Sequence, residues 1–264
     1  MVSDEIVHIV IAPPDLLETN LVNKVAAIIN KDIYSTRLLL TGKIPRVIAH
    51  YQTFQAADSA AQSLRALGLV SIVCTDSELR KLSLTGLRAH SLILGLGEVT
   101  FCTKGGEART VKAKNVFLIL KGITQTRTEK EVTTTKMKLS LTSTLLAGIP
   151  IQRKVKEKTI ETSVESEYFI RLYNRKSSEP EVEIFQNTFD YSFLGKKMAP
   201  SSLINLSTIA TELRITFLQA VFDDKLTEPF GVDIPFVKPE DQTEINCKLI
   251  CMYYQVVSCP RPLA

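Results

Sequence analysis

The amino-acid sequence predicts an α+β protein: a small split β-α-α-β-α-β two-layer domain, followed by a mainly antiparallel β domain with a terminal packing helix. Three observations support this prediction. Residues 44–76 contain a short apolar run, an amphipathic helical stretch and a second short apolar run. Residues 91–174 hold β-rich runs separated by turn signals, and residues 201–226 show a strong helical apolar period. We therefore expect domains at 1–76 and 91–264, joined by a polar connector at 77–90.

Composition places the chain among ordinary globular proteins. It has 264 residues, of which 45% are hydrophobic and 23% charged, which is typical of a soluble domain with its own core. No apolar run approaches the ~20 residues of a membrane span. Asp4 and Glu5 stand where a secretory signal needs positive charge, so a cytoplasmic location is predicted. Five cysteines form no framework spacing, which argues against a disulfide scaffold.

The first elements follow from local signals. The β-branched run at 6–12 predicts a strand that ends at a Pro-Pro pair. A helix is expected from Asp15 to about residue 29, and a second, short helix after Asp32, which can cap it. Apolar residues at helical spacing predict the buried stripe of the first helix: Leu17, Leu21, Val25 and Ile28.

A strand–helix–strand unit completes this domain. A strand is predicted at 46–51, a helix at about 54–67 and a strand at 70–74. The helix should bury Ala57, Ala60, Ala61 and Leu64 and end at Gly68. Right-handed crossover then lets the first strand insert between the other two.

This order of elements resembles the C-terminal domain of the bacterial ribosomal stalk protein and the related Clp protease adaptor fold. The likeness rests on Asn-Lys-Val-Ala-Ala-Ile at 23–28 and on Pro45, Ala57, Leu64 and Gly68. It implies a fold rather than a function, since these are packing and turn positions. The lysine- and glycine-rich factor-binding surface of the stalk domain and the Asn-Asp-Asp of the adaptor are both replaced, so neither binding role is implied.

The rest of the chain is predicted to be β-rich. Strands are expected near 90–103, 107–126, 136–144 and 167–174, with a hairpin turn at Lys104–Glu107. Residues 99–122 resemble a bacterial pleckstrin-homology-like module, which also ends in a packing helix. Residues 124–136 and 147–167 are expected to be exposed loops. One helix should span 201–226 and bury Leu206, Ile209, Leu213, Phe217 and Val221, and residues 244–259 are expected to form a strand or two.

Charge is unevenly distributed. Residues 104–158 carry thirteen basic and four acidic side chains, a net charge of +9, whereas residues 159–264 carry −5. The two segments can neutralise each other across an interface, which is the favoured interpretation, or the basic segment can attract phosphates. In the second case the candidate anion-binding residues are Lys104, Arg109, Lys112, Lys114, Arg153, Lys154 and Lys156.

Motifs for catalysis are not apparent. Gly95 and Gly97 lack the third glycine of a dinucleotide loop. Cys247, Cys251 and Cys259 share one side of an extended chain but are best interpreted as buried thiols rather than a metal site. His8 and His50 should lie side by side as a surface pair, and His90 in the solvated connector. Asp223 and Asp224 are expected at a hydrated helix end.

The sequence therefore predicts no catalytic residue, metal ligand or cofactor. A non-catalytic interaction or scaffold protein with a protein partner is favoured. The alternatives are binding of nucleic acid or an anionic lipid headgroup through 104–158, and an enzyme with a dispersed site at the domain seam. That site would use residues such as Arg46, His50, Asp190 and Asp223.

Overall fold

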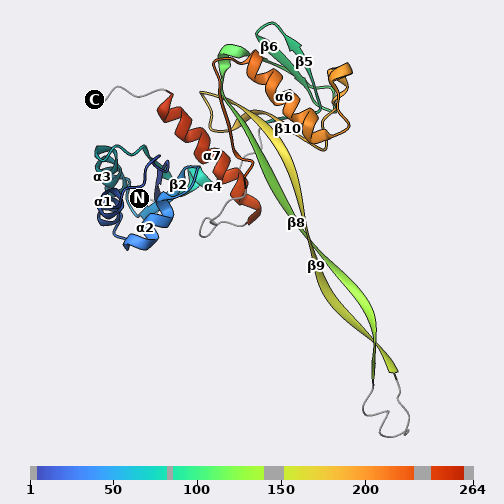
Figure 1. Cartoon of the computed structure of the whole chain (residues 1–264), viewed down its shortest axis with the longest axis horizontal. Helices are drawn as coiled ribbons and strands as arrows, with labels where there is room; N and C mark the ends of the chain where they lie inside the picture. The colour runs from blue at the N-terminus through green and yellow to red at the C-terminus, as the bar shows by residue number, and fades with distance from the viewer. Residues whose placement is uncertain (1–4, 82–85, 140–151, 229–238, 259–264) are drawn as a thin grey trace. The chain divides into compact units, whose positions relative to one another are not determined.

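The computed structural model describes residues 5–81, 86–139, 152–228 and 239–258; side chains are described outside 126–164 and 239–240 (Figure 1). The chain divides into two compact units. One consists of residues 1–124 and 167–264, and the other of residues 125–166. Helices and several sheets together make an α+β protein, as the sequence predicts.

The first sheet has three strands. Strand β1 (Val7–Ile11) lies between β2 (Arg46–Tyr51) and β3 (Ser71–Thr75) and runs antiparallel to both. All five β1 residues are buried: four are apolar and β-branched, as expected for a central strand, and the fifth is His8. The predicted insertion of the first strand between the other two is confirmed.

Three helices pack with this sheet: α1 (Thr19–Ile29), α2 (Ile33–Leu40) and α3 (Phe54–Ala66). The predicted cap of α2 is present, because the Asp32 carboxylate accepts a hydrogen bond from the Ser35 backbone N–H at 2.9 Å. Helix α3 buries Ala57, Ala61 and Leu64 as expected, whereas Ala60 is only partly buried. The α1 stripe differs from the prediction, since its fully buried members are Val22, Val25, Ala26 and Ile29.

The expected connector contains two elements. Helix α4 (Asp76–Arg80) starts directly after β3 with a capping box formed by Thr75 and Glu78. Strand β4 (Leu87–Ala89) pairs in parallel with β10 (Pro180–Phe185). Leu87 and Ala89 are buried and Arg88 is exposed, so this short run has the alternation of a half-buried strand.

Two further sheets follow. Strands β5 (Ser91–Gly95), β6 (Glu98–Cys102) and β7 (Ala108–Lys112) form an antiparallel sheet. The other sheet has the order β11-β8-β9-β10-β4, in which β10–β4 and β11–β8 are parallel pairs. Its remaining strands are β8 (Val116–Leu139), β9 (Gln152–Asn174) and β11 (Val221–Leu226). Short 3-10 turns occur at Ala113–Asn115 and Ser192–Lys197.

The two loops expected at 124–136 and 147–167 are wrong wherever the structure describes them. Residues 124–136 lie in β8, and residues from Gln152 onward lie in β9. Within the unit at 125–166 these strands run side by side as a twisted two-stranded ribbon (Figure 1). Threonine and valine favour an extended backbone, and paired strands need no apolar period to form their ladder of backbone hydrogen bonds.

The helix expected at 201–226 is shorter. Helix α6 (Ser202–Thr216) buries Leu206, Ile209 and Leu213, as predicted, against the core beneath it. The chain then turns, and Val221 begins β11, where it pairs with Leu118 of β8. Val221 therefore continues the helical spacing only by coincidence.

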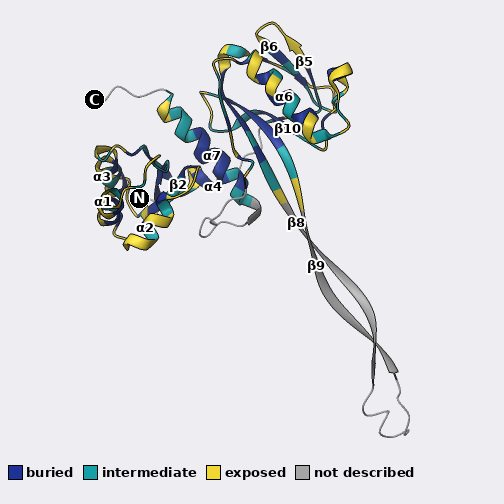
Figure 2. Cartoon of the chain, viewed as in Figure 1, coloured by how far each residue is buried: buried dark blue, intermediate teal, exposed yellow. Residues whose placement is uncertain are grey.

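The strand expected at 244–259 is a helix, α7 (Pro239–Val257). Apolar residues on two sides of this helix pack in two different clusters. Ile245 and Leu249 join Val10 and Leu79 in one cluster, while Cys247, Ile250 and Cys251 join β8 and β9 in another. Figure 2 shows the middle of this helix as buried. Its β-branched, tyrosine-rich composition suggested a strand, but burial on opposite sides follows the helical period of 3.6. Among the described residues, no helix has the length and apolar character needed to cross a membrane.

Candidate anion-binding site

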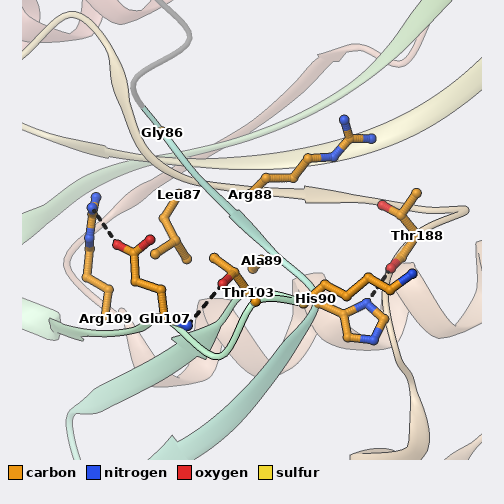
Figure 3. A pocket seen from close by; sticks show the side chains of 11 residues that line it. Gly86, Leu87, Arg88, Ala89, His90, Thr103, Glu107, Arg109 and Thr188 are labelled. Carbon is orange, nitrogen blue, oxygen red and sulfur yellow. Dashed lines mark hydrogen bonds and ion pairs between the residues drawn. The ribbon is translucent and has the colours of Figure 1, made fainter.

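A pocket of about 520 Å³ opens where β4, the turn between β6 and β7, and the loop after β10 come together (Figure 3). This volume lies in the range of small-molecule sites. Residues 86–90 line one side, residues 103–105, 107 and 109 line the other, and Thr188 completes the rim.

Positive charge dominates the pocket lining. Arg88, Lys104 and Arg109 contribute three cations, and Glu107 contributes one carboxylate. Arg109 is partly neutralised, since a guanidinium nitrogen lies 3.7 Å from the Glu107 carboxylate and another donates to the Glu181 carbonyl at 3.2 Å. Arg88 instead lies 4.4 Å from the centre of the Phe185 ring, and its charge interacts with that of Glu183, its partner in the β4–β10 register.

A tight turn holds Lys104 at the rim. The Thr103 backbone N–H donates to the Glu107 carbonyl at 2.8 Å, and the Glu107 N–H donates to the Thr103 hydroxyl at 3.1 Å. Gly106 has a φ of 86°, a left-handed conformation that glycine adopts without strain. The predicted hairpin turn at Lys104–Glu107 is thus confirmed, and it fixes the backbone from which Lys104 extends.

His90 is anchored by three hydrogen bonds. Its backbone N–H donates to the Cys102 carbonyl and its carbonyl accepts from the Asp190 N–H, both at 2.7 Å. Its Nδ1 lies 2.8 Å from the Thr188 carbonyl, which can only accept, so Nδ1 carries a proton. The other ring nitrogen, Nε2, is left to serve as acceptor or donor. The expectation of a solvated connector histidine is wrong, because His90 is half-buried and joins three segments.

The structure brings two of the predicted anion-binding residues together, Lys104 and Arg109. Lys112 and Lys114 are exposed but do not line this pocket. Arg109 and Val111 share one face of β7 and Val111 is buried, whereas Lys112 lies on the opposite face beside Glu98. The side chains of Arg153, Lys154 and Lys156 lie outside the described residues.

The four residues named for a dispersed enzyme site have separate partners in the described structure. Asp190 accepts hydrogen bonds from Ser192, which lower the pKa of its carboxyl group. Asp223 is buried and accepts a bond from the Tyr254 hydroxyl at 2.7 Å, so the expected hydrated helix end is wrong. His50 contacts His8, and burial lowers the pKa of Arg46. Within the described part of the chain, no side-chain hydrogen bond or ion pair joins any two of the four.

Three of the described cysteines are buried, and Cys102 is partly buried. Burial raises the pKa of the Cys74, Cys247 and Cys251 thiols to about 12 in each case. Such thiols are protonated at neutral pH and are poor nucleophiles and metal ligands. Within the described part of the chain, no group of three or more histidine, cysteine or acidic residues could hold a metal ion. Cys259 lies outside the described residues.

Comparisons with protein-family models, with curated proteins and with solved structures give no match. The resemblances to the stalk and adaptor fold and to the pleckstrin-homology-like module therefore stay predictions.

Proposed function

We propose that this is a non-catalytic binding protein whose ligand carries a phosphate group, and that the group binds in the pocket between β4 and the β6–β7 turn. The observation that supports this is the surplus of cations around that pocket: Arg88, Lys104 and Arg109 against Glu107 alone. Hydrogen bonds between a cation and a phosphate oxygen are among the stronger ones in proteins.

Binding rather than turnover is favoured by the contacts of the lining residues. In catalysis by a nucleophile, a base must be hydrogen-bonded to the attacking hydroxyl or thiol. Here the His90 Nδ1 lies against a backbone carbonyl, no hydrogen bond among the described residues joins its Nε2 to a hydroxyl or thiol, and the Thr103 hydroxyl accepts a bond from Glu107 within the turn. These groups are used to hold the pocket walls in place.

Calorimetric titration with inorganic pyrophosphate at low salt tests the proposal. Lys104→Ala and Arg88→Met each remove one cation, and loss of a charged hydrogen bond worth about 1.5–3 kcal/mol weakens binding roughly tenfold or more. Methionine keeps an unbranched apolar side chain beside the Phe185 ring, which the Arg88 guanidinium contacts in the native protein.

Lys112→Ala is the matched control, because it removes the same charge from the opposite face of β7. Its affinity should stay within about twofold of the native protein. No heat of binding at low salt, or equal weakening by Lys104→Ala and Lys112→Ala, would overturn the proposal. The second result would indicate general attraction to the basic segment.

A further inference from the structure

Three side chains of the first sheet and of α4 form a hydrogen-bonded chain. His8 and His50 are directly opposed in the β1–β2 register, and their Nδ1 atoms lie 2.7 Å apart. The His8 Nε2 lies 3.0 Å from the Asp76 carboxylate, which also accepts from Arg80 at 2.8 Å. His8 is buried and His50 is exposed. The sequence predicted the pairing of the two histidines, but as a surface pair without an acidic partner; the structure corrects both points.

The chain of contacts determines where the ring protons lie. Burial acts to raise the pKa of Asp76, but the hydrogen bonds from Arg80 and His8 outweigh it and the pKa is lowered. The carboxylate is therefore ionised and can only accept, so His8 Nε2 carries a proton. In a neutral His8 the Nδ1 is then a lone pair, and the close Nδ1–Nδ1 contact requires His50 to donate from its Nδ1. The Nε2 of His50 is left as a lone pair.

This arrangement has room for one added proton and not for two. A proton on His50 Nε2 leaves every bond of the chain in place, and the positive charge lies in line with the Asp76 carboxylate. A second proton would have to go to His8 Nδ1, where it would face the Nδ1–H of His50 at 2.7 Å. Two like charges at that distance repel strongly, and the side-chain hydrogen bond between His8 and His50 would be lost.

We propose that His8 and His50 form one proton-binding site, entered at His50 Nε2, that makes the β1–β2 pairing sensitive to acid. The site is separate from the phosphate pocket and does not depend on it. The site binds a proton, and we expect proton binding to change the stability of the sheet formed by β1, β2 and β3.

The surroundings of the two histidines determine whether acid stabilises or destabilises the folded protein. Partial burial lowers the pKa of His50, positive charge on the His8 ring or on Lys31 lowers it further, and Asp76 opposes them. On the other side of His8, Arg80 contacts Asp76, and Cys74 of β3 pairs with His8 in the register. The folded pair can hold one added proton, whereas the two histidines of the unfolded chain can hold two, so the folded state binds fewer protons in acid. The stabilisation is complete above the unfolded histidine pKa and is lost as the pH falls below it.

Nitrogen NMR of the histidine rings in the native protein tests the proton positions directly. Above about pH 7.5, where histidine is neutral, His8 should carry its proton on Nε2 and His50 on Nδ1. Protonation should then begin at His50 Nε2, while the contact between the two Nδ1 atoms keeps a single proton. A His50 that carries its proton on Nε2 at high pH would overturn the proposal.

Urea unfolding between about pH 7.5 and pH 5 tests the effect on stability. The native protein should lose part of its urea midpoint over this range, and His50→Gln should reduce that loss because glutamine does not titrate. Lys112→Ala is the control, since it removes an exposed charge that lies outside these contacts, and it should retain the native pH dependence. Equal pH dependence in the native protein and His50→Gln would refute the proposal.

Discussion

Replacement of Arg171 by methionine should strongly destabilise the protein. Arg171 is 2% exposed, yet it carries a full charge. Its Nε lies 2.7 Å from a Glu183 carboxylate oxygen, and its two terminal nitrogens donate to Glu244. The guanidinium carbon also lies 4.7 Å from the centre of the Phe169 ring. This one side chain thus links β9, β10 and α7.

The size of the stability loss depends on which carboxylate remains buried without a cationic partner. The Glu244 side chain is 29% exposed and can regain water, whereas that of Glu183 is only 5% exposed and cannot. Breaking a buried ion pair by removing one partner costs about 3–5 kcal/mol, because the other charge is left without compensation. We expect a loss of that size in the free energy of unfolding, with Glu183 as its main source.

Urea unfolding followed by far-ultraviolet circular dichroism measures this loss, since the chain has no tryptophan for fluorescence. The double variant Arg171→Met/Glu183→Leu should recover much of the lost stability, because it removes both buried charges and keeps apolar volume. A loss below about 1 kcal/mol in Arg171→Met would refute the reasoning, since that is the value of an exposed pair. A double variant no more stable than the single one would also contradict it.

The pH dependence of the free energy of unfolding of Arg171→Met tests the role of Glu183 independently. Burial raises the pKa of Glu183, and Arg171 opposes that rise in the native protein. Without Arg171 the pKa should rise further, so the folded state would bind a proton more readily than the unfolded chain. The variant should therefore regain stability as the pH is lowered through the folded pKa of Glu183.

Two more predictions rest on packing. Gly122→Ala should lower the free energy of unfolding, measured by thermal unfolding, by about 1–3 kcal/mol, because a Cβ there would lie 2.5 Å from the Phe169 ring and 2.9 Å from Leu226. Gly105→Ala is the control. Its Cβ would have its nearest neighbour 3.7 Å away, so the stability should change little. Cys247, with its thiol pKa raised to about 12 by burial, should react with a thiol reagent only when the protein unfolds, and rapid labelling in the native state would contradict the described burial.

The N-terminal sheet could be predicted because its signals are local. Asp32 caps a helix within its own turn, and Gly68 ends one with a φ of 84°. The C-terminal half depends on distant partners. Val221 continues a helical spacing but pairs with Leu118 of β8, and the apolar residues of α7 face two separate clusters. A pattern within one segment does not show which other segment will cover it.

In the candidate pocket, too, local signals indicated some residues, whereas others are brought in only by distant partners. Lys104 and Arg109 stand out in a basic segment that flanks a glycine turn, so charge alone indicated them. Arg88 and His90 come from a stretch expected to be a connector, and only pairing of β4 with β10 and the bonds to Cys102 and Thr188 bring them to the pocket. Asp76 was missed beside the histidines for a related reason, since its carboxylate reaches His8 only through the capped start of α4.

The parallel pairing of β4 with β10 has a consequence for synthesis on the ribosome. The N-terminal sheet has all of its strands once Thr75 has emerged, because β1, β2 and β3 precede that point. Strand β4 emerges next, but its partner β10 begins only at Pro180. The nascent chain must therefore carry an unpaired strand edge while residues 90–179 are made, and such edges are sites of mispairing and aggregation.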